Sequence, residues 1–377
     1  MTAATRPELS SVSEPTVYVA FELSAKQWKL AMTSGFGVAP WVRTVTSGDL
    51  AAVARAIAQA RRRFALPPST PAMSCYEAGR DGFWIHRALT AQGIASRVVD
   101  SASIEVNRRA RRAKTDRLDA LKLVAMLVRV GHGEGGVWRE VRVPSVAEEA
   151  ARHVSRERTA LTQEQTRLIN QLRSWLTTWG CTLPSRRADR WWTTVRDWAG
   201  SPLPAPVQGR LERAHGRWLA LEAQLAAVDA QQTAATAAAA PESALGRLVQ
   251  VKGVGTTSAS VLLDEGLVWR AFRNRRELGG ILGFAPTPYQ SGDRRHEQGI
   301  SRAGNHRLQG VSVQLAWLWV RWQPDSPITQ WYQTRFAAGS SRLRRIGIVA
   351  VARRLLIALW RYATTGVVPA GAILKSV

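Results

Sequence analysis

Cysteines and long hydrophobic runs are both scarce in this sequence. Its 377 residues include two cysteines, Cys75 and Cys181, too few for a disulfide framework or a cysteine-based zinc site. No apolar run approaches the roughly 20 residues that a membrane helix needs, and residues 1–15 lack the apolar segment of a signal peptide. We therefore expect a cytoplasmic protein in a reducing compartment, with no membrane among its partners.

Acidic residues are also scarce relative to basic ones. The chain has 52 lysines and arginines against 28 aspartates and glutamates, which gives a net charge of +24. Only six of the 52 are lysines, so nearly every cation is a guanidinium, the better bidentate ligand for phosphate. A GC-rich genome explains arginine over lysine, but it does not explain the excess itself. The charge predicts a nucleic acid as partner, with an acidic protein or an anionic membrane as the alternative.

The basic residues form three separated clusters, which indicates a long polyanion rather than one compact phosphate site. The first cluster consists of Arg108, Arg109, Arg111, Arg112, Lys114 and Arg117. The second consists of Arg270, Arg273, Arg275, Arg276, Arg294, Arg295, Arg302 and Arg307. The third consists of Arg342, Arg344, Arg345, Arg353 and Arg354.

The length predicts two or three domains, and the hydrophobic pattern predicts an α/β part followed by an all-α part. Residues 1–15 are expected to be a disordered arm. An α/β domain is expected over 16–145, a helical coiled-coil spacer over 146–240, and a mainly helical domain over 241–377.

The α/β domain reads as a sheet with interleaved helices. Strands are predicted at 17–23, 27–34, 41–45, 71–77 and 96–100, and helices at 47–64 and 81–92. This order matches the ribonuclease H-like (RuvC-like) fold, in which the first and fourth strands lie side by side at the centre of the sheet.

Four carboxylates occupy positions that this topology brings together. Glu22 ends the first strand, Glu77 ends the fourth, and Asp116 and Asp119 share one face of a helix predicted over 114–128. Carboxylates gathered in this way repel unless divalent cations neutralise them. Two hard cations such as Mg²⁺, held by carboxylate oxygens, activate a nucleophile and stabilise the leaving oxygen of a phosphodiester.

Simpler interpretations of these acids stay open. Aspartates in the first turn of a helix often only favour the helix dipole. Three further acids lie close enough in sequence to be alternatives, namely Asp81, Asp100 and Glu105.

The spacer carries two helical patterns, over 146–180 and around 211–228, with apolar residues on one side of each. The two helices can pair within the chain or form the coiled coil of a dimer. The stretch 231–246 is low in complexity and predicts a hinge or linker. Between the helices, Trp191, Trp192 and Trp198 lie among arginines and are core residues or stack on unpaired bases.

The segment 248–265 has the pattern of a helix-hairpin-helix. Lys252, Gly253, Gly255 and Thr256 form its turn, where glycines allow close approach of the backbone and the next helix offers amides to a phosphate. It is not a Walker A loop, because its lysine precedes the glycines. A DNA-backbone contact is predicted, with a purely structural turn as the alternative.

Residues 287–310 are rich in Ser, Gly, Arg and His, and they predict a polar loop that leads into a helix over 308–322. By composition alone, Ser291 is a turn serine.

Two groups of motifs resemble one family. FELSAKQWKLA, CYEAGRDGFWIHRAL and VNRRARRAKTDRLDALKL resemble the RuvC-like DEDD domain of insertion-sequence transposases, and GFAPTPYQSG with ISRAGNHRLQG resembles their C-terminal serine Tnp domain. The resemblance implies that Glu22, Glu77, Asp116 and Asp119 bind the metal ions. Glu22 departs from the pattern, since the first position is usually Asp.

The resemblance also implies a nucleophile and partners. Ser291 would attack a DNA phosphodiester and form a phosphoserine, with Ser301 as its rival. The residues that would hold the phosphates are Arg294, Arg295, His296, Arg302 and Asn305. The implied partners are donor and target DNA, a structured guide (bridge) RNA and further copies of the chain in a dimer or tetramer, near the prokaryotic nucleoid.

Two other functions fit the same residues. A RuvC-like nuclease or junction resolvase would use the metal ions and attack with water, without Ser291. A non-enzymatic nucleic-acid-binding protein would carry the same basic clusters, and its acids would be ordinary surface residues.

Overall fold

The computed structural model describes residues 14–104, 115–185, 189–267, 270, 272–291, 294–301 and 304–375, with 286–298 described by their backbone alone. The chain divides into two compact units, residues 1–143 and 144–377. The predicted arm lies almost wholly outside the described residues. The predicted spacer and C-terminal domain belong to the same unit, so their boundary at residue 240 stays a prediction.

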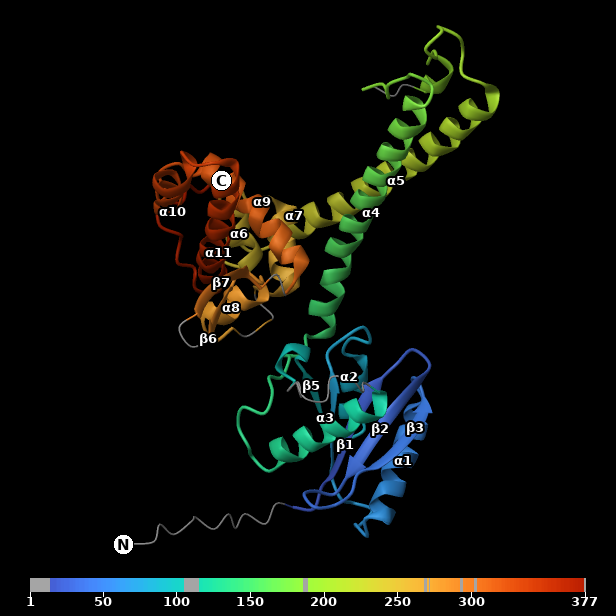
Figure 1. Ribbon diagram of the computed structural model, residues 1–377, viewed down its shortest axis with the longest axis vertical. Helices are drawn as coiled ribbons and strands as arrows, with labels where there is room; N and C mark the ends of the chain where they lie inside the picture. Colours follow the sequence, from blue (N-terminus) through green and yellow to red (C-terminus); the bar gives the residue numbers. More distant parts are fainter. Residues whose placement is uncertain are drawn as a thin grey trace. The chain divides into compact units, whose positions relative to one another are not determined.

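A five-stranded mixed sheet forms the centre of the first unit (Figure 1). Its order is β3-β2-β1-β4-β5; β1 pairs antiparallel with β2 and parallel with β4. The strands are β1 (Val17–Leu23), β2 (Gln27–Thr33), β3 (Trp41–Thr46), β4 (Ala72–Glu77) and β5 (Ala95–Val99). The predicted fold class is confirmed, with the first and fourth strands adjacent at the centre.

Helices cover both faces of this sheet. Successive residues of β1 point to opposite faces, so Val17, Val19 and Phe21 pack with α1 (Leu50–Arg63) and α2 (Trp84–Ala91). On the other face, Tyr18, Ala20 and Cys75 of the sheet pack with Ala120, Leu123, Val124 and Leu127 of α3 (Asp116–Gly131). The three inner strands β2, β1 and β4 are thus buried along most of their length, whereas the edge strand β3 is exposed or half-buried throughout.

The second unit begins with two long helices, α4 (Val146–Thr177) and α5 (Ala205–Ala237), which pack on each other. Leu168, Leu172 and Leu176 of α4 share a core with Leu211 and Trp218 of α5. Pairing within the chain therefore accounts for both apolar stripes.

The linker predicted at 231–246 is partly wrong, because α5 continues to Ala237. Alanine has the highest helix propensity, so an alanine-rich run extends a helix that is already packed.

The rest of the second unit is mainly helical, as predicted. Its helices are α6 (Ala244–Gln250), α7 (Thr256–Leu262), α8 (Arg275–Ile281), α9 (His306–Trp322), α10 (Pro327–Tyr332) and α11 (Ser341–Thr365). A hairpin of β6 (Pro286–Ser291) and β7 (Arg294–Ile300) lies between α8 and α9, so the polar loop predicted over 287–310 is wrong for these residues. Pairing of two strands satisfies their backbone N–H and C=O groups whatever side chains they carry. A hairpin of polar residues can therefore form without the apolar alternation by which a strand is predicted from sequence. In the described part of the chain, every helix is too short or too polar to span a membrane.

Candidate functional site

The C-terminal ends of β1 and β4 bring two glutamates to one end of the sheet. The strands are parallel, with Phe21 opposite Tyr76, so the residues that follow, Glu22 and Glu77, end neighbouring strands. Residues alternate between faces along a strand, so Glu22 lies on the face of Tyr18 and Ala20, the face that α3 covers. Glu77 lies on the same face, two residues after Cys75.

The direction of α3 brings its aspartates to the same end. Gly131, at the C-terminal end of α3, packs so closely on Tyr18 that a Cβ there would clash with the ring. Further back in the helix, the carbonyl of Leu123 lies 3.9 Å from Cys75 Sγ. The helix therefore runs antiparallel to β1 and β4. Asp119, one turn before Leu123, lies toward the strand ends that carry the glutamates.

We call Glu22, Glu77, Asp116 and Asp119 the carboxylate edge. Glu22 and Asp119 are partly buried, whereas Glu77 and Asp116 are exposed. Carboxylate oxygens are the donors that Mg²⁺ and similar hard cations prefer, so the residue types and their placement fit a divalent ion. Among the described residues, no three His, Cys, Asp or Glu side chains come together closely enough to hold a metal. The metal-binding role of the carboxylate edge therefore stays a prediction.

The alternative acids have other partners. Asp81 forms an ion pair with Arg80 at 3.2 Å. Asp100 accepts a hydrogen bond from the backbone N–H of Ala102 at 3.1 Å and lies 3.6 Å from Arg139. Glu105 and the basic residues Arg108, Arg109, Arg111, Arg112 and Lys114 lie outside the described residues.

The candidate serine lies at the turn of the β6–β7 hairpin. Ser291 is the last residue of β6 and pairs with Arg294, the first residue of β7. Further along, Gln290 pairs with Arg295 and Tyr289 with His296. The backbone therefore brings the serine and three predicted phosphate-binding residues, Arg294, Arg295 and His296, to one end of the hairpin. Arg302 lies outside the described residues.

The other end of the hairpin is fixed by backbone contacts. Ser301 donates its backbone N–H to the carbonyl of Ala285 at 3.1 Å and its hydroxyl to the carbonyl of Gly283 at 3.3 Å. Asn305 donates its backbone N–H to the carbonyl of Ile281 at 2.8 Å. Ser301 therefore anchors the loop, and the choice between Ser291 and Ser301 as nucleophile stays a prediction.

A buried glutamate lies next to this loop. Glu265 is 0% exposed, and Arg156 binds both of its carboxylate oxygens, at 3.0 and 3.2 Å. Arg307 Nε lies 3.1 Å from the carboxylate, Asn305 Nδ2 donates to it at 2.8 Å, and Arg152 lies 3.8 Å away. We call these five residues the Glu265 cluster. Burial by itself would raise the pKa of Glu265, but hydrogen bonds from Arg156 and Asn305 and the nearby positive charges outweigh it and lower the pKa.

The Glu265 cluster joins α4 to the start of α9, directly after the hairpin. Sequence analysis missed it, although a glutamate in the apolar segment 259–267 was a usable signal. Asn305, which the sequence assigns to nucleic-acid binding, also caps α9 by accepting from the backbone N–H groups of Arg307 and Leu308. The amide nitrogen and the amide oxygen of Asn305 thus both form hydrogen bonds within the protein.

The helix-hairpin-helix turn packs against the end of α9. Gly253 has φ 94°, a left-handed conformation that favours glycine, and a Cβ there would lie 3.5 Å from the Trp322 ring. Lys252 Nζ lies 5.5 Å from the centre of that ring, and Gln323 donates to the Lys252 carbonyl at 2.8 Å. Gly255 is the N-cap of α7, and Thr256 is its first residue. These contacts account for the turn structurally, and its contact with DNA stays a prediction.

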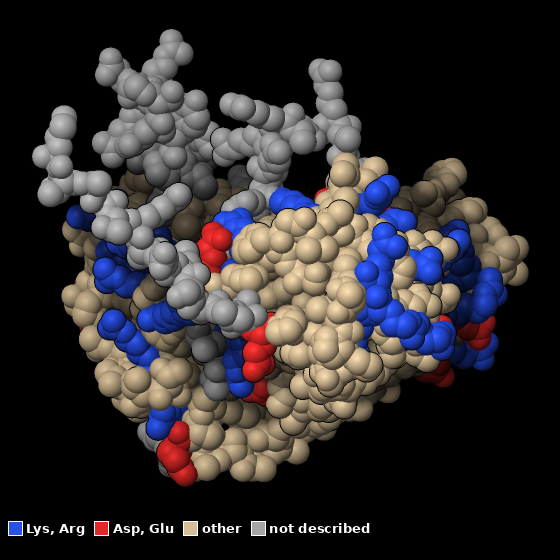
Figure 2. All heavy atoms as spheres, turned by 90° about the horizontal axis from the view of Figure 1, so that it is seen from below, with Lys and Arg blue, Asp and Glu red and all other residues tan. Residues whose placement is uncertain are grey.

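Basic side chains predominate on the described surface. Figure 2 shows one face of the molecule, with Lys and Arg in several groups and few acidic side chains between them. Of the three tryptophans between α4 and α5, Trp191 and Trp192 are buried in the core. Trp198 is 82% exposed, so stacking on an unpaired base stays a prediction for this residue alone of the three. A surface of this kind binds a polyanion through many phosphate contacts.

Asp264, next to the Glu265 cluster, predicts a pH dependence of stability. Burial raises its pKa from 3.8 to about 6, although a hydrogen bond with Ser155 and the charges of Arg307 and Arg152 oppose the shift. Because the folded-state pKa is the higher one, the stability that neutral Asp264 contributes is complete below about pH 4 and is lost as the pH rises through about 6. Glu265 acts in the opposite direction. Because its pKa is lowered, the ionised carboxylate contributes stability above its ordinary pKa of 4.5, and this contribution is lost as the pH falls below that value.

We therefore expect the Asp264→Asn variant to lose less stability than the wild type between pH 4 and pH 7. Thermal unfolding midpoints across this range measure the difference. Parallel curves for the two proteins would show that Asp264 does not titrate there.

Comparison with known proteins adds independent information. A family model described as "Transposase IS116/IS110/IS902 family" matches residues 246–333, a span that includes the β6–β7 hairpin and Glu265. A second model, described as "Transposase" and representing the DEDD domain of IS110 elements, matches residues 53–180, which include Glu77, Asp116 and Asp119.

Curated relatives of the chain are transposases by name, as the two family models are. A Sinorhizobium fredii protein named "Putative transposase y4rJ" is 38% identical over 395 residues, covering 100% of both chains. A second protein of that organism, "Putative transposase y4qE", is 26% identical and covers 77% of this chain and 74% of its own. The "Transposase for insertion sequence element IS1328" of Yersinia enterocolitica is 23% identical, covering 59% of this chain and 65% of its own.

Proposed function

Since the chain belongs to the IS116/IS110/IS902 family of transposases, we propose that it cuts and rejoins the DNA strands of an insertion element by means of the carboxylate edge and Ser291. The observation that carries the proposal is the meeting of two strand ends and one helix start at a single edge. Four acids of a chain with net charge +24 lie near the C-terminal ends of β1 and β4 and in the first turn of α3, and this placement supports a shared site.

Glu22, Glu77, Asp116 and Asp119 would hold one or two divalent cations, with Mg²⁺ as the ion to test first. A bound cation supplies Lewis-acid polarisation of the phosphate and stabilises the leaving oxygen. Mutual repulsion of the acids would favour cation binding, because a bound cation compensates their negative charges. Glu22, the residue before the end of β1, is one methylene longer than the usual Asp.

Ser291 is the proposed nucleophile. Its Oγ forms a bond to the phosphorus of a DNA phosphodiester, the bond from phosphorus to the leaving sugar oxygen breaks, and the serine proton passes to a base. The product is a phosphoserine that conserves one phosphoester bond for rejoining to a new strand. The backbone pairing of Ser291 with Arg294, which Arg295 follows, supports this role, since an arginine paired with the nucleophile can supply positive charge to the phosphate.

The proposed partners are donor DNA, target DNA and a structured guide RNA, bound by a dimer or tetramer of the chain. The net charge supports an extensive polyanionic partner. The basic residues 108–114 and 294–302, with the helix-hairpin-helix turn at 252–256, are the proposed contacts.

The serine role is tested with donor DNA, target DNA and Mg²⁺, followed by denaturing electrophoresis for protein–DNA adducts. The wild type is expected to form an adduct, and Ser291→Ala to form none and to lose recombination. Ser301→Ala is the matched control, because Ser301 anchors the loop; it is expected to keep adduct formation. Recombination by Ser291→Ala would overturn the proposal. If Ser301→Ala lost the adduct while Ser291→Ala still formed it, Ser301 would be the nucleophile.

A metal-dependent nuclease that attacks with water is the second candidate, because the carboxylate edge is built entirely by the first unit. It predicts Mg²⁺-dependent cleavage that is indifferent to Ser291→Ala and leaves no adduct. The same assay therefore separates the two candidates.

A further inference from the structure

A pocket of about 290 Å³ lies between α9, α10, the turn at Gln333–Ala337 and the start of α11. No part of it belongs to the carboxylate edge or to the serine hairpin. Its lining consists of Trp317, Tyr332, Gln333, Ala337, Ser341, Arg344 and Arg345. The pocket thus combines aromatic rings with arginines and polar groups, and its lining includes no acidic residue.

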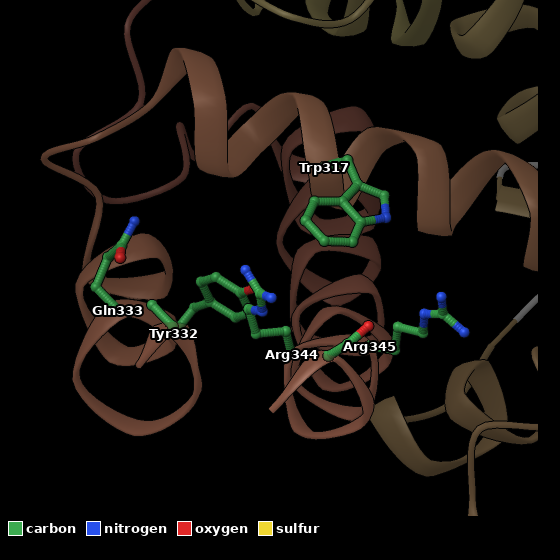
Figure 3. A pocket seen from close by; sticks show the side chains of 7 residues that line it. Trp317, Tyr332, Gln333, Arg344 and Arg345 are labelled. Carbon is green, nitrogen blue, oxygen red and sulfur yellow. The ribbon is translucent and has the colours of Figure 1, made fainter. Parts of the chain in front are cut away.

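Trp317 supplies an accessible aromatic surface. It is 47% exposed, whereas Trp319, two residues later on α9, is 2% exposed and holds the core. Figure 3 shows the Trp317 ring projecting from α9 over the first turns of α11. A large exposed indole beside a pocket adds nothing to the core, so its surface is available to a ligand.

The charges around this ring are positive. Figure 3 shows Arg344 extending toward Tyr332 and Arg345 extending to the other side of α11. Both arginines line the pocket together with Trp317. Both residues follow Ser341, the first residue of α11, where the helix dipole adds positive potential. From Gly299 to the C-terminus, Asp325 is the sole acidic residue of the sequence. The ligand that this field favours is an anion.

An exposed indole in a pocket lined by two arginines matches the chemistry of one nucleotide in a strand. An unpaired base stacks on an indole, and the phosphates before and after it can bind one arginine each. A paired base cannot stack there, because both its faces are covered by neighbouring base pairs. The volume is at the small end of the range for ligand pockets, about 300–1,000 Å³, as expected for one base.

We propose that this pocket binds an unpaired nucleotide of a DNA or RNA strand, with its base on Trp317 and its flanking phosphates at Arg344 and Arg345. The proposal rests on the proposed function only in that the chain handles nucleic acid, and it is independent of Ser291 and of the carboxylate edge. Adduct formation tests those residues, so the two proposals can fail separately.

The test measures binding of the full chain to a short labelled single-stranded DNA, to the RNA of the same sequence, and to the blunt DNA duplex. Trp317→Ala is expected to weaken binding of a single strand about 5- to 100-fold and to leave duplex binding unchanged. Trp84→Ala is the control, because Trp84 is an exposed tryptophan of the first unit and lies outside the pocket lining. Trp317→Phe is expected to restore part of the affinity. The preferred single strand, DNA or RNA, identifies the source of the nucleotide.

Two further readouts separate stacking from charge. Removing bases from the strand is expected to weaken binding by the wild type but not by Trp317→Ala. Arg344→Gln and Arg345→Gln are each expected to lower the slope of log affinity against log salt by about 0.7, with Arg361→Gln on the same helix as the control. Equal effects of Trp317→Ala and Trp84→Ala, an equal loss on duplex, or no effect of missing bases would each overturn the proposal.

Discussion

Replacing Glu265 with alanine is expected to destabilise the second unit by about 3–5 kcal/mol, the usual cost of removing one partner from a buried ion pair. Glu265 is fully buried and binds Arg156 through two hydrogen bonds of 3.0 and 3.2 Å. Without the carboxylate, Arg156 and Arg307 repel each other, and Asn305 loses its acceptor. Urea unfolding followed by circular dichroism measures the change.

The matched control for this prediction is Glu242→Ala, since Glu242 is exposed in the segment before α6. Its expected effect is within about 0.5 kcal/mol of zero, as for most surface substitutions. Glu265→Gln should lie between the two, because an amide keeps an acceptor for Asn305 but loses the charge that the arginines need. Equal stability of the Glu265→Ala and Glu242→Ala proteins would refute the structural role of the cluster.

Asp119→Asn is expected to slow Mg²⁺-dependent strand cleavage on the order of 10³-fold. An amide is isosteric with a carboxylate but is a poorer ligand for a hard cation, and a loss of about 4 kcal/mol of transition-state stabilisation gives this factor. Asp119 is the partly buried aspartate of the pair on α3, so its side chain is the better placed to face Glu22 and Glu77. Cleavage of labelled DNA over a range of Mg²⁺ concentrations measures the effect.

Two controls sharpen this prediction. Asp81→Asn is expected to keep nearly full activity, because Asp81 pairs with Arg80. Glu22→Asp restores the residue usual in the family and is expected to keep or raise activity, whereas Glu22→Gln should reduce it as strongly as Asp119→Asn. Full activity of Asp119→Asn, or a loss confined to Asp81→Asn, would exclude the carboxylate edge as the catalytic site.

The sequence by itself determined the first unit and its acidic edge. The alternation of apolar residues in 17–23 and 71–77 marks two buried strands, and the order of strands and helices is enough to place those strands next to each other. Because Glu22 and Glu77 end the strands, their neighbourhood follows from topology, without any knowledge of side-chain packing. The family membership follows equally from local motifs.

Only the tertiary structure decided which side chains meet across long distances. Arg156 and Glu265 are 109 residues apart, and no local pattern marks one as the partner of the other. Likewise Trp317 and Trp319 belong to the same helix, yet one lines a pocket and the other fills the core. Periodicity depends on neighbours within a few residues, whereas burial and ion pairing depend on which helix packs against which, and that is settled only when the whole unit folds.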